Sequence, residues 1–255
     1  MKIQAVFFDM GGTIETYRYT RQLRLEATPG LRERLSRAGI ELPLTDEAVL
    51  DLVSAGLSRY KKWSVRSMDE LPPQQVWSVY VFEGMDAAQK MTPDMAEELM
   101  VYVETQFYER AMRPELPAAL EAIRSMGLKM GVISNVCSRG QVPINLEKYG
   151  IKSYFDPIVL SSEYGRRKPD PAIFQYAAWL ARVPAGRSVY IGYRINRDIE
   201  GARRAGFGMA VQIRHEFGHE DGAAEVQPAA EVQPAAEVQP AAEGRAEVAV
   251  QADVL

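Results

Sequence analysis

The sequence has little of the chemistry that builds covalent cross-links or metal clusters. Its 255 residues include one cysteine, Cys137, and two histidines, His215 and His219. A single cysteine excludes an internal disulfide and a cysteine-rich zinc site. Two histidines near one chain end also exclude a multi-histidine metal centre. A disulfide framework and these two kinds of metal site are therefore ruled out.

A strong excess of one charge and a long apolar run are also missing. The formal net charge is -4, and residues 221–255 hold seven of the acidic side chains against one basic side chain, Arg245. The remainder is nearly neutral, so no basic face is expected to bind nucleic acid. No apolar run approaches the ~20 residues of a membrane-spanning helix, and the first residues lack the features of a signal peptide. We expect a cytoplasmic protein.

The apolar content that is present is enough for a globular core. Hydrophobic residues make up 47% of the chain and charged residues 25%, which are ordinary values. A short apolar run at 3–8 ends in glycines, and after residue 113 short apolar runs alternate with helical patterns. This alternation predicts an α/β fold with a parallel sheet and right-handed crossovers.

Three parts of the chain differ in hydrophobic pattern and composition, and these differences suggest the domain organisation. Residues 1–14 and 113–220 carry the α/β pattern, and we predict that they form one core. Residues 15–112 show apolar positions at helical spacing and no alternating strand, which predicts an all-helical insert. Residues 221–255 contain Glu-Val-Gln-Pro-Ala-Ala three times in succession. Low complexity and negative charge predict a disordered tail there.

The first predicted strand ends at a carboxylate, Asp9, which is followed by Gly11 and Gly12. Parallel sheets bind ligands at the carboxyl ends of their strands. A carboxylate there can act as a nucleophile, and glycines allow backbone N–H groups to approach an anion. Taken alone, Asp9 could equally be a residue that caps the turn.

Further polar residues follow later predicted strands. Ser134 and Asn135 end the second strand and could bind phosphate oxygens. Lys168 precedes a helix that starts with proline, so its amine could lie beside an anionic site, and Asp198 opens the last helix. Each of these also fits an ordinary turn, a solvated loop or a helix start.

The order and spacing of these residues closely resemble the haloacid dehalogenase superfamily of hydrolases, in the branch with a helical cap after the first motif. The resemblance covers about residues 1–214 and rests on FFDMGGT, GVISN, SSEYGRRKPDPAIF and DIEGARRAG. It implies a Rossmann-like core with an inserted helical cap. It also implies hydrolysis of a small phosphorylated metabolite through an aspartyl-phosphate intermediate.

The resemblance also implies roles for individual residues. Asp9 would be the nucleophile, and Lys168 would neutralise both this carboxylate and the intermediate. Four residues would bind the substrate: Gly11, Ser134, Asn135 and Arg194. Mg²⁺ would be held by Asp9, the Gly11 carbonyl and Asp198. The physical reason for these cations is that a carboxylate cannot attack a phosphate dianion unless the repulsion between them is offset.

Two positions depart from the phosphatase pattern. The pattern has a second aspartate two residues after the nucleophile, where this chain has Gly11, which cannot transfer a proton. The pattern has an acidic metal ligand in the last motif, where this chain has Tyr193. These changes predict slow turnover and a weak Mg²⁺ site. Arg194 and Arg197 flank this motif and could offset a phosphate without a full metal site.

The departures leave other functions open. One is an inactive relative that binds a phosphorylated ligand or a protein. Another is altered chemistry, either dehalogenase-like or phosphonatase-like, and the second would need a cap lysine such as Lys61 or Lys62. We expect a monomer or a homodimer.

Overall fold

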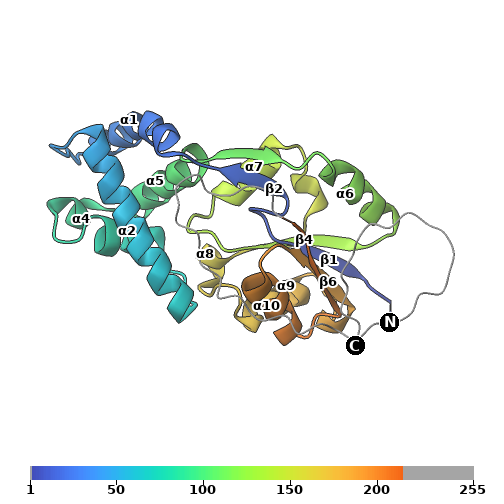
Figure 1. The fold of residues 1–255 in the computed structure, drawn as a ribbon. Helices are drawn as coiled ribbons and strands as arrows, with labels where there is room; N and C mark the ends of the chain where they lie inside the picture. Colours follow the sequence, from blue (N-terminus) through green and yellow to red (C-terminus); the bar gives the residue numbers. More distant parts are fainter. Residues whose placement is uncertain (1, 215–255) are drawn as a thin grey trace, which may run out of the picture.

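The computed structural model describes residues 2–214, and the predicted low-complexity tail lies outside the described residues. The larger part of the molecule is built around a five-stranded parallel sheet in the order β5-β4-β1-β6-β7 (Figure 1). Its strands are β1 (Ala5–Phe8), β4 (Lys129–Ser134), β5 (Ile158–Leu160), β6 (Ser188–Gly192) and β7 (Met209–Gln212). The predicted α/β class with a Rossmann-like parallel sheet is confirmed.

Helices cover both faces of this sheet, which buries the strands on both sides (Figure 1). One face packs against α6 (Leu116–Ser125) and α7 (Gln141–Lys148), the other against α9 (Pro171–Leu180) and α10 (Glu200–Arg204). Successive side chains of β1 alternate between the two cores, with Val6 and Phe8 in one and Phe7 in the other. This explains why the strand reads as a continuous apolar run.

A separate group of helices, which we call the helical insert (residues 21–106), lies to one side of the sheet (Figure 1). Its elements are α1 (Arg21–Arg37), α2 (Asp46–Ser67), α3 (Pro73–Gln75), the π-helical η1 (Val76–Val81), α4 (Asp86–Lys90) and α5 (Pro93–Gln106). The hydroxyls of Thr45 and Thr92 cap α2 and α5. The insert has a core of its own, with Tyr60, Trp77 and Phe82 fully buried.

The ends of the range predicted to be all helical are strands instead. β2 (Glu15–Arg18) and β3 (Glu109–Met112) pair antiparallel and join the insert to the sheet. Each has only four residues and mixed polarity, so neither shows a strand period. The buried carboxylate of Glu15 accepts from Asn145 at 2.9 Å and Tyr149 at 2.8 Å, and this fixes the pair to α7.

The insert is hydrogen-bonded to loops that follow the carboxyl ends of the strands. Glu104 of α5 accepts backbone N–H bonds from Cys137 and Ser138, both at 2.9 Å, in the loop after β4. On the second loop, which follows the short helix α8 (Ser161–Tyr164), Arg167 N donates to the Met68 carbonyl at 2.8 Å. The insert therefore lies at the ligand-binding edge of the sheet.

The larger part also contains two short 3₁₀ turns, η2 (Lys152–Tyr154) and η3 (Ala185–Arg187). Within residues 2–214, every helix is too short or too polar to cross a membrane.

Candidate active site

Asp9 lies where β1 ends, and its side chain is held on both oxygens. Its backbone N–H continues the sheet pattern by donating to Ile191 at 2.9 Å. Oδ1 accepts from Lys168 Nζ at 2.7 Å, and Oδ2 accepts from Arg197 Nη2 at 2.6 Å. The residue is only 3% exposed, so these charge-assisted bonds lie in a largely water-free environment.

Lys168 is fixed by contacts at both ends. Its Nζ donates to the Ile133 carbonyl at 2.8 Å and to the Tyr190 hydroxyl at 2.6 Å, in addition to Asp9. Its backbone exchanges two 2.9 Å hydrogen bonds with the side-chain amide of Asn135. We predicted that Asn135 binds substrate. In the structure its side-chain amide is hydrogen-bonded to the backbone of Lys168.

Asp198 is brought to the same point by the turn after β6. The turn is η4 (Ile195–Ile199), a π-helical segment, and Asp198 Oδ2 accepts N–H bonds from Tyr193 at 3.3 Å and Arg194 at 3.1 Å. Gly192 is required because a Cβ there would lie 2.5 Å from Asp198 Cβ. Burial alone would raise the pKa of Asp198, but Lys168 and Arg197 outweigh burial and hold this pKa well below its usual range.

Arg197 is the residue that sequence reasoning undervalued. Its Nη2 lies 2.6 Å from Asp9 and 2.9 Å from Asp198, and its Nε lies 3.0 Å from Asp198 Oδ1. Burial would lower the pKa of Arg197, but the two carboxylates raise it well above its ordinary value. The only signal in the sequence was a basic residue directly before Asp198.

Tyr190 was missed entirely. It lies in the middle of β6 and is fully buried, and its hydroxyl touches Lys168. A tyrosine in a buried strand needs a partner for its hydroxyl, and this requirement was the available signal.

Two tyrosines stand over the glycine turn that follows Asp9. A Cβ on Gly11 would meet the Tyr17 ring at 3.4 Å, and a Cβ on Gly12 would lie 2.5 Å from the Tyr193 ring. Gly12 also has φ +88, so glycine is needed there on both counts. The two hydroxyls are 3.2 Å apart, and burial together with Tyr193 raises the pKa of Tyr17. Arg194 Nε donates to the Tyr193 hydroxyl at 3.1 Å.

Ser134 ends β4 beside β1, where the parallel register sets Phe8 opposite Val132. Ser134 therefore lies at the same edge of the sheet as Asp9, and it is 4% exposed. The structure thus places four of the residues singled out from the sequence at one edge of the sheet: Asp9, Ser134, Lys168 and Asp198.

The predicted Mg²⁺ donor set does not fit a metal ion. All four carboxylate oxygens of Asp9 and Asp198 are contacted by Lys168 or Arg197. In the part of the chain from residue 2 to 214, no three side chains of His, Cys, Asp or Glu converge as metal ligands. A divalent ion would have to displace the guanidinium. In the structure these two carboxylates are therefore paired with side-chain cations instead of being open to Mg²⁺.

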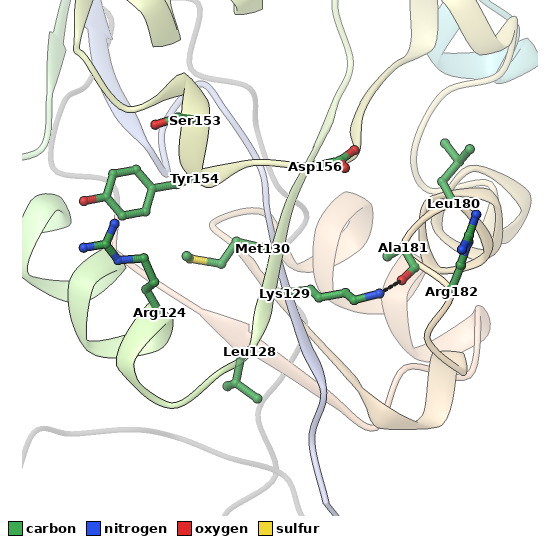
Figure 2. Close-up of a pocket in the computed structure, with 10 residues that line it drawn as sticks. All are labelled: Arg124, Leu128, Lys129, Met130, Ser153, Tyr154, Asp156, Leu180, Ala181 and Arg182. Carbon is green, nitrogen blue, oxygen red and sulfur yellow. Dashed lines mark hydrogen bonds between the residues drawn. The ribbon is translucent and has the colours of Figure 1, made fainter.

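A surface hollow of about 500 Å³ lies elsewhere (Figure 2). It is lined by Leu128, Lys129 and Met130, where β4 begins, and Lys129 Nζ donates to the Ala181 carbonyl at 2.6 Å. Because β4 ends at Ser134, this hollow lies at the opposite edge of the sheet and is not part of the candidate site.

Comparison with known proteins defines the class. The sequence model of the Haloacid dehalogenase-like hydrolase family matches residues 46–211. The chain belongs to this family and is a phosphatase-like hydrolase.

Among its relatives is a glyceraldehyde 3-phosphate phosphatase of Methanopyrus kandleri, which is 30% identical over 83% of this chain and 84% of the relative. An N-acylneuraminate-9-phosphatase of Rattus norvegicus is 26% identical over 85% of each chain. The solved structure of a HAD phosphatase from Thermococcus onnurineus has a TM-score of 0.56 at 23% identity, over 86% of this chain and 90% of the other. This last similarity concerns the fold alone.

Proposed function

We propose that the chain hydrolyses a small phosphorylated metabolite, with Asp9 as the nucleophile. The observation that carries this proposal is the Asp9 carboxylate, which lies at the ligand-binding edge of the sheet between the Lys168 ammonium and the Arg197 guanidinium. Two adjacent cations lower the repulsion that a phosphate would otherwise meet. The phosphatase names of the relatives support the same reaction class.

The reaction proceeds in two displacements. An oxygen of Asp9 forms a bond to phosphorus as the ester bond breaks, and the departing alcohol oxygen takes a proton from water. The remaining hydroxide then attacks phosphorus and breaks the bond to Asp9. One water molecule thus supplies the proton of the alcohol and the oxygen of inorganic phosphate. Ser134 contacts the phosphoryl oxygens, and Asn135 positions Lys168.

The helical insert serves as the cap of this active site, and the described residues of the predicted core, 2–14 and 113–214, serve as the catalytic core. The docking of Glu104 on the loop after β4 supports this division, because it brings the insert to the edge where Asp9 lies. Selectivity among phosphorylated metabolites then depends on the insert and its junction with the sheet.

Replacing Asp9 tests the proposal. We expect wild-type protein to hydrolyse para-nitrophenyl phosphate, and Asp9→Asn to lose at least about a thousandfold of that rate, because an amide is not a nucleophile. Asp51→Asn is the matched control, since Asp51 lies exposed on α2 and pairs with Arg21. Circular dichroism checks that both variants fold. Activity that persists in Asp9→Asn would overturn the assignment.

The substrate class is tested with phosphate release from a panel of compounds. The panel contains glyceraldehyde 3-phosphate and an N-acylneuraminate 9-phosphate, the substrates in the names of the two relatives described above. We propose that a compound of this small, phosphorylated class is turned over.

The second candidate is dehalogenase-like chemistry, in which Asp9 would attack a carbon atom. The resemblance implies that dehalogenases use no metal, so the side-chain cations around Asp9 favour this candidate. Release of halide from a 2-haloacid, with no phosphate release from the panel, would support this candidate instead. The phosphonatase-like alternative gains no support, because Lys61 and Lys62 are both exposed on α2.

A further inference from the structure

The two carboxylates of the active site share two side-chain cations. Asp9 contacts Lys168 at 2.7 Å and Arg197 at 2.6 Å, and Asp198 contacts the same two residues at 3.0 Å and 2.9 Å. The four groups alternate in sign around a ring. Their formal charges cancel, so the ring is neutral without any other ion.

Arg197 is built into this position by the local fold. It lies in η4 directly before Asp198, and its side chain is only 22% exposed. The Tyr193 ring lies under its guanidinium, with Cζ 5.1 Å from the ring centroid, a cation–π distance. Tyr193 is also the position where the resemblance leads us to expect an acidic metal ligand. A tyrosine at this position thus takes away the expected metal ligand and provides an aromatic ring that packs against the Arg197 guanidinium.

From this arrangement we infer that the Arg197 guanidinium takes the place of the divalent cation, so that the hydrolase works without a metal. The inference rests on the proposed function, which supplies the reaction. Arg197 offsets the charge of the phosphoryl group beside Asp9. A guanidinium suits this task because its N–H donors match the geometry of phosphate oxygens.

Metal dependence tests the inference in two ways. Wild-type hydrolysis of para-nitrophenyl phosphate should be the same with EDTA and with added Mg²⁺. Titration calorimetry with Mg²⁺ alone should give no heat of binding to the wild-type protein. The double variant Tyr193→Asp with Arg197→Asn places three carboxylates together, and it should bind Mg²⁺ in the same experiment.

Removal of the guanidinium tests the role of Arg197 itself. Arg197→Ala should lose roughly 100-fold in rate in EDTA, and free guanidinium ion should restore part of that loss. Arg124→Ala is the control, because Arg124 lies on α6, is 65% exposed and lines the hollow at the opposite edge of the sheet (Figure 2). Guanidinium should have no effect on the control. If Arg197→Ala fails to fold, Arg197→Lys takes its place, because it keeps the positive charge but lacks the planar N–H donors of the guanidinium. The calorimetry of the wild-type protein with Mg²⁺ tests the inference in either case.

The outcomes separate this inference from the proposed function. Wild-type activity that EDTA abolishes and Mg²⁺ restores, or one Mg²⁺ bound per wild-type chain, would overturn the inference and leave the hydrolase assignment standing. Absence of hydrolysis on every substrate under every metal condition would overturn the proposed function, and with it this inference. Activity in EDTA with no Mg²⁺ binding would support both.

Discussion

At the scale of single residues, the proposed catalytic groups are held in place by a buried ring of Asp9, Lys168, Asp198 and Arg197. Each side chain is within 3.0 Å of two partners of opposite charge. Removing one member of such a group leaves a buried charge without compensation, which costs about 3–5 kcal/mol. Each member of the ring therefore stabilises the fold against the uncompensated charge that its removal would leave.

Asp198→Asn should show this contribution through its pH dependence. The pKa of Asp198 is lowered in the folded protein, so its stabilisation is present above the unfolded value of ~3.9 and is lost as the pH falls toward the folded value. We expect the variant to be about 3–5 kcal/mol less stable than wild type from pH 6 to 8. Urea unfolding below about pH 4 should show the difference shrinking. A difference independent of pH would contradict this account.

Because Gly11 has no side chain to donate a proton, the rate of hydrolysis should depend strongly on the leaving group. With no proton donor at this position, a phenolate that needs no proton should leave much faster than an alkoxide. Gly11→Asp should therefore raise turnover of alkyl phosphates by about tenfold or more, and turnover of para-nitrophenyl phosphate by less. The backbone permits the change, since the nearest atom to an added Cβ is 3.4 Å away.

Gly11→Ala is the matched control because it adds the Cβ without the acid. It should leave the ratio of alkyl to aryl rates unchanged. If both variants change this ratio equally, the effect is steric, and the proposed lack of a proton donor is wrong.

Some site residues could be read from the sequence and others could not. Asp9, Ser134 and Lys168 follow from the rule that ligands meet the carboxyl ends of parallel strands. Arg197 was predicted only as one of two flanking arginines, because its direction depends on the π-helical turn η4. One extra residue in such a turn rotates every side chain that follows.

At the scale of elements, helix α5 connects the insert to the active-site edge. Glu97 and Glu104 of this helix accept backbone N–H bonds from the four residues 137–140 after β4. Burial raises the pKa of Glu104 despite these bonds. The loop after Ser134 is therefore fixed by the insert.

Thiol labelling of Cys137 should report the opening of this contact. Burial, with Glu70 and Glu104 nearby, raises the pKa of the Cys137 thiol, so labelling of the wild-type protein should be slow. Glu104→Ala removes two charge-assisted hydrogen bonds, and we expect labelling to be about tenfold faster or more. Glu98→Ala, at an exposed position of α5 beside Arg34, should label at the wild-type rate. Equal rates in all three proteins would show that Glu104 does not hold the loop.

The parallel strands and the longer helices were predictable because their local sequence patterns are strong. Buried strands such as β4 read as apolar runs between glycines and turns, and Thr45 and Thr92 mark helix starts. The β2–β3 pair was not predictable. Its strands are separated by the whole insert, and pairing over that distance leaves no local pattern in four residues of mixed polarity.

At the scale of the whole molecule, the insert has one core and the sheet has a core on each face, and β2 and β3 join the two parts (Figure 1). Asp9 lies just before this junction, and Lys168 lies just after the loop that the insert contacts through Met68 and Glu70. A movement of the insert would therefore change the surroundings of both proposed catalytic groups. The account depends on Asp9 as the residue that receives the phosphoryl group.

Mass spectrometry of the Asp9 peptide, after acid quenching of a turnover mixture, tests that claim most directly. Acid is needed because acyl phosphates hydrolyse quickly at neutral pH. The turnover reaction is run in EDTA before the acid quench. We predict that the wild-type peptide then gains the mass of one phosphoryl group, and that the Asp9→Asn peptide gains none. Phosphate release in the wild-type reaction with the label absent from Asp9, or present on another residue, would contradict the account.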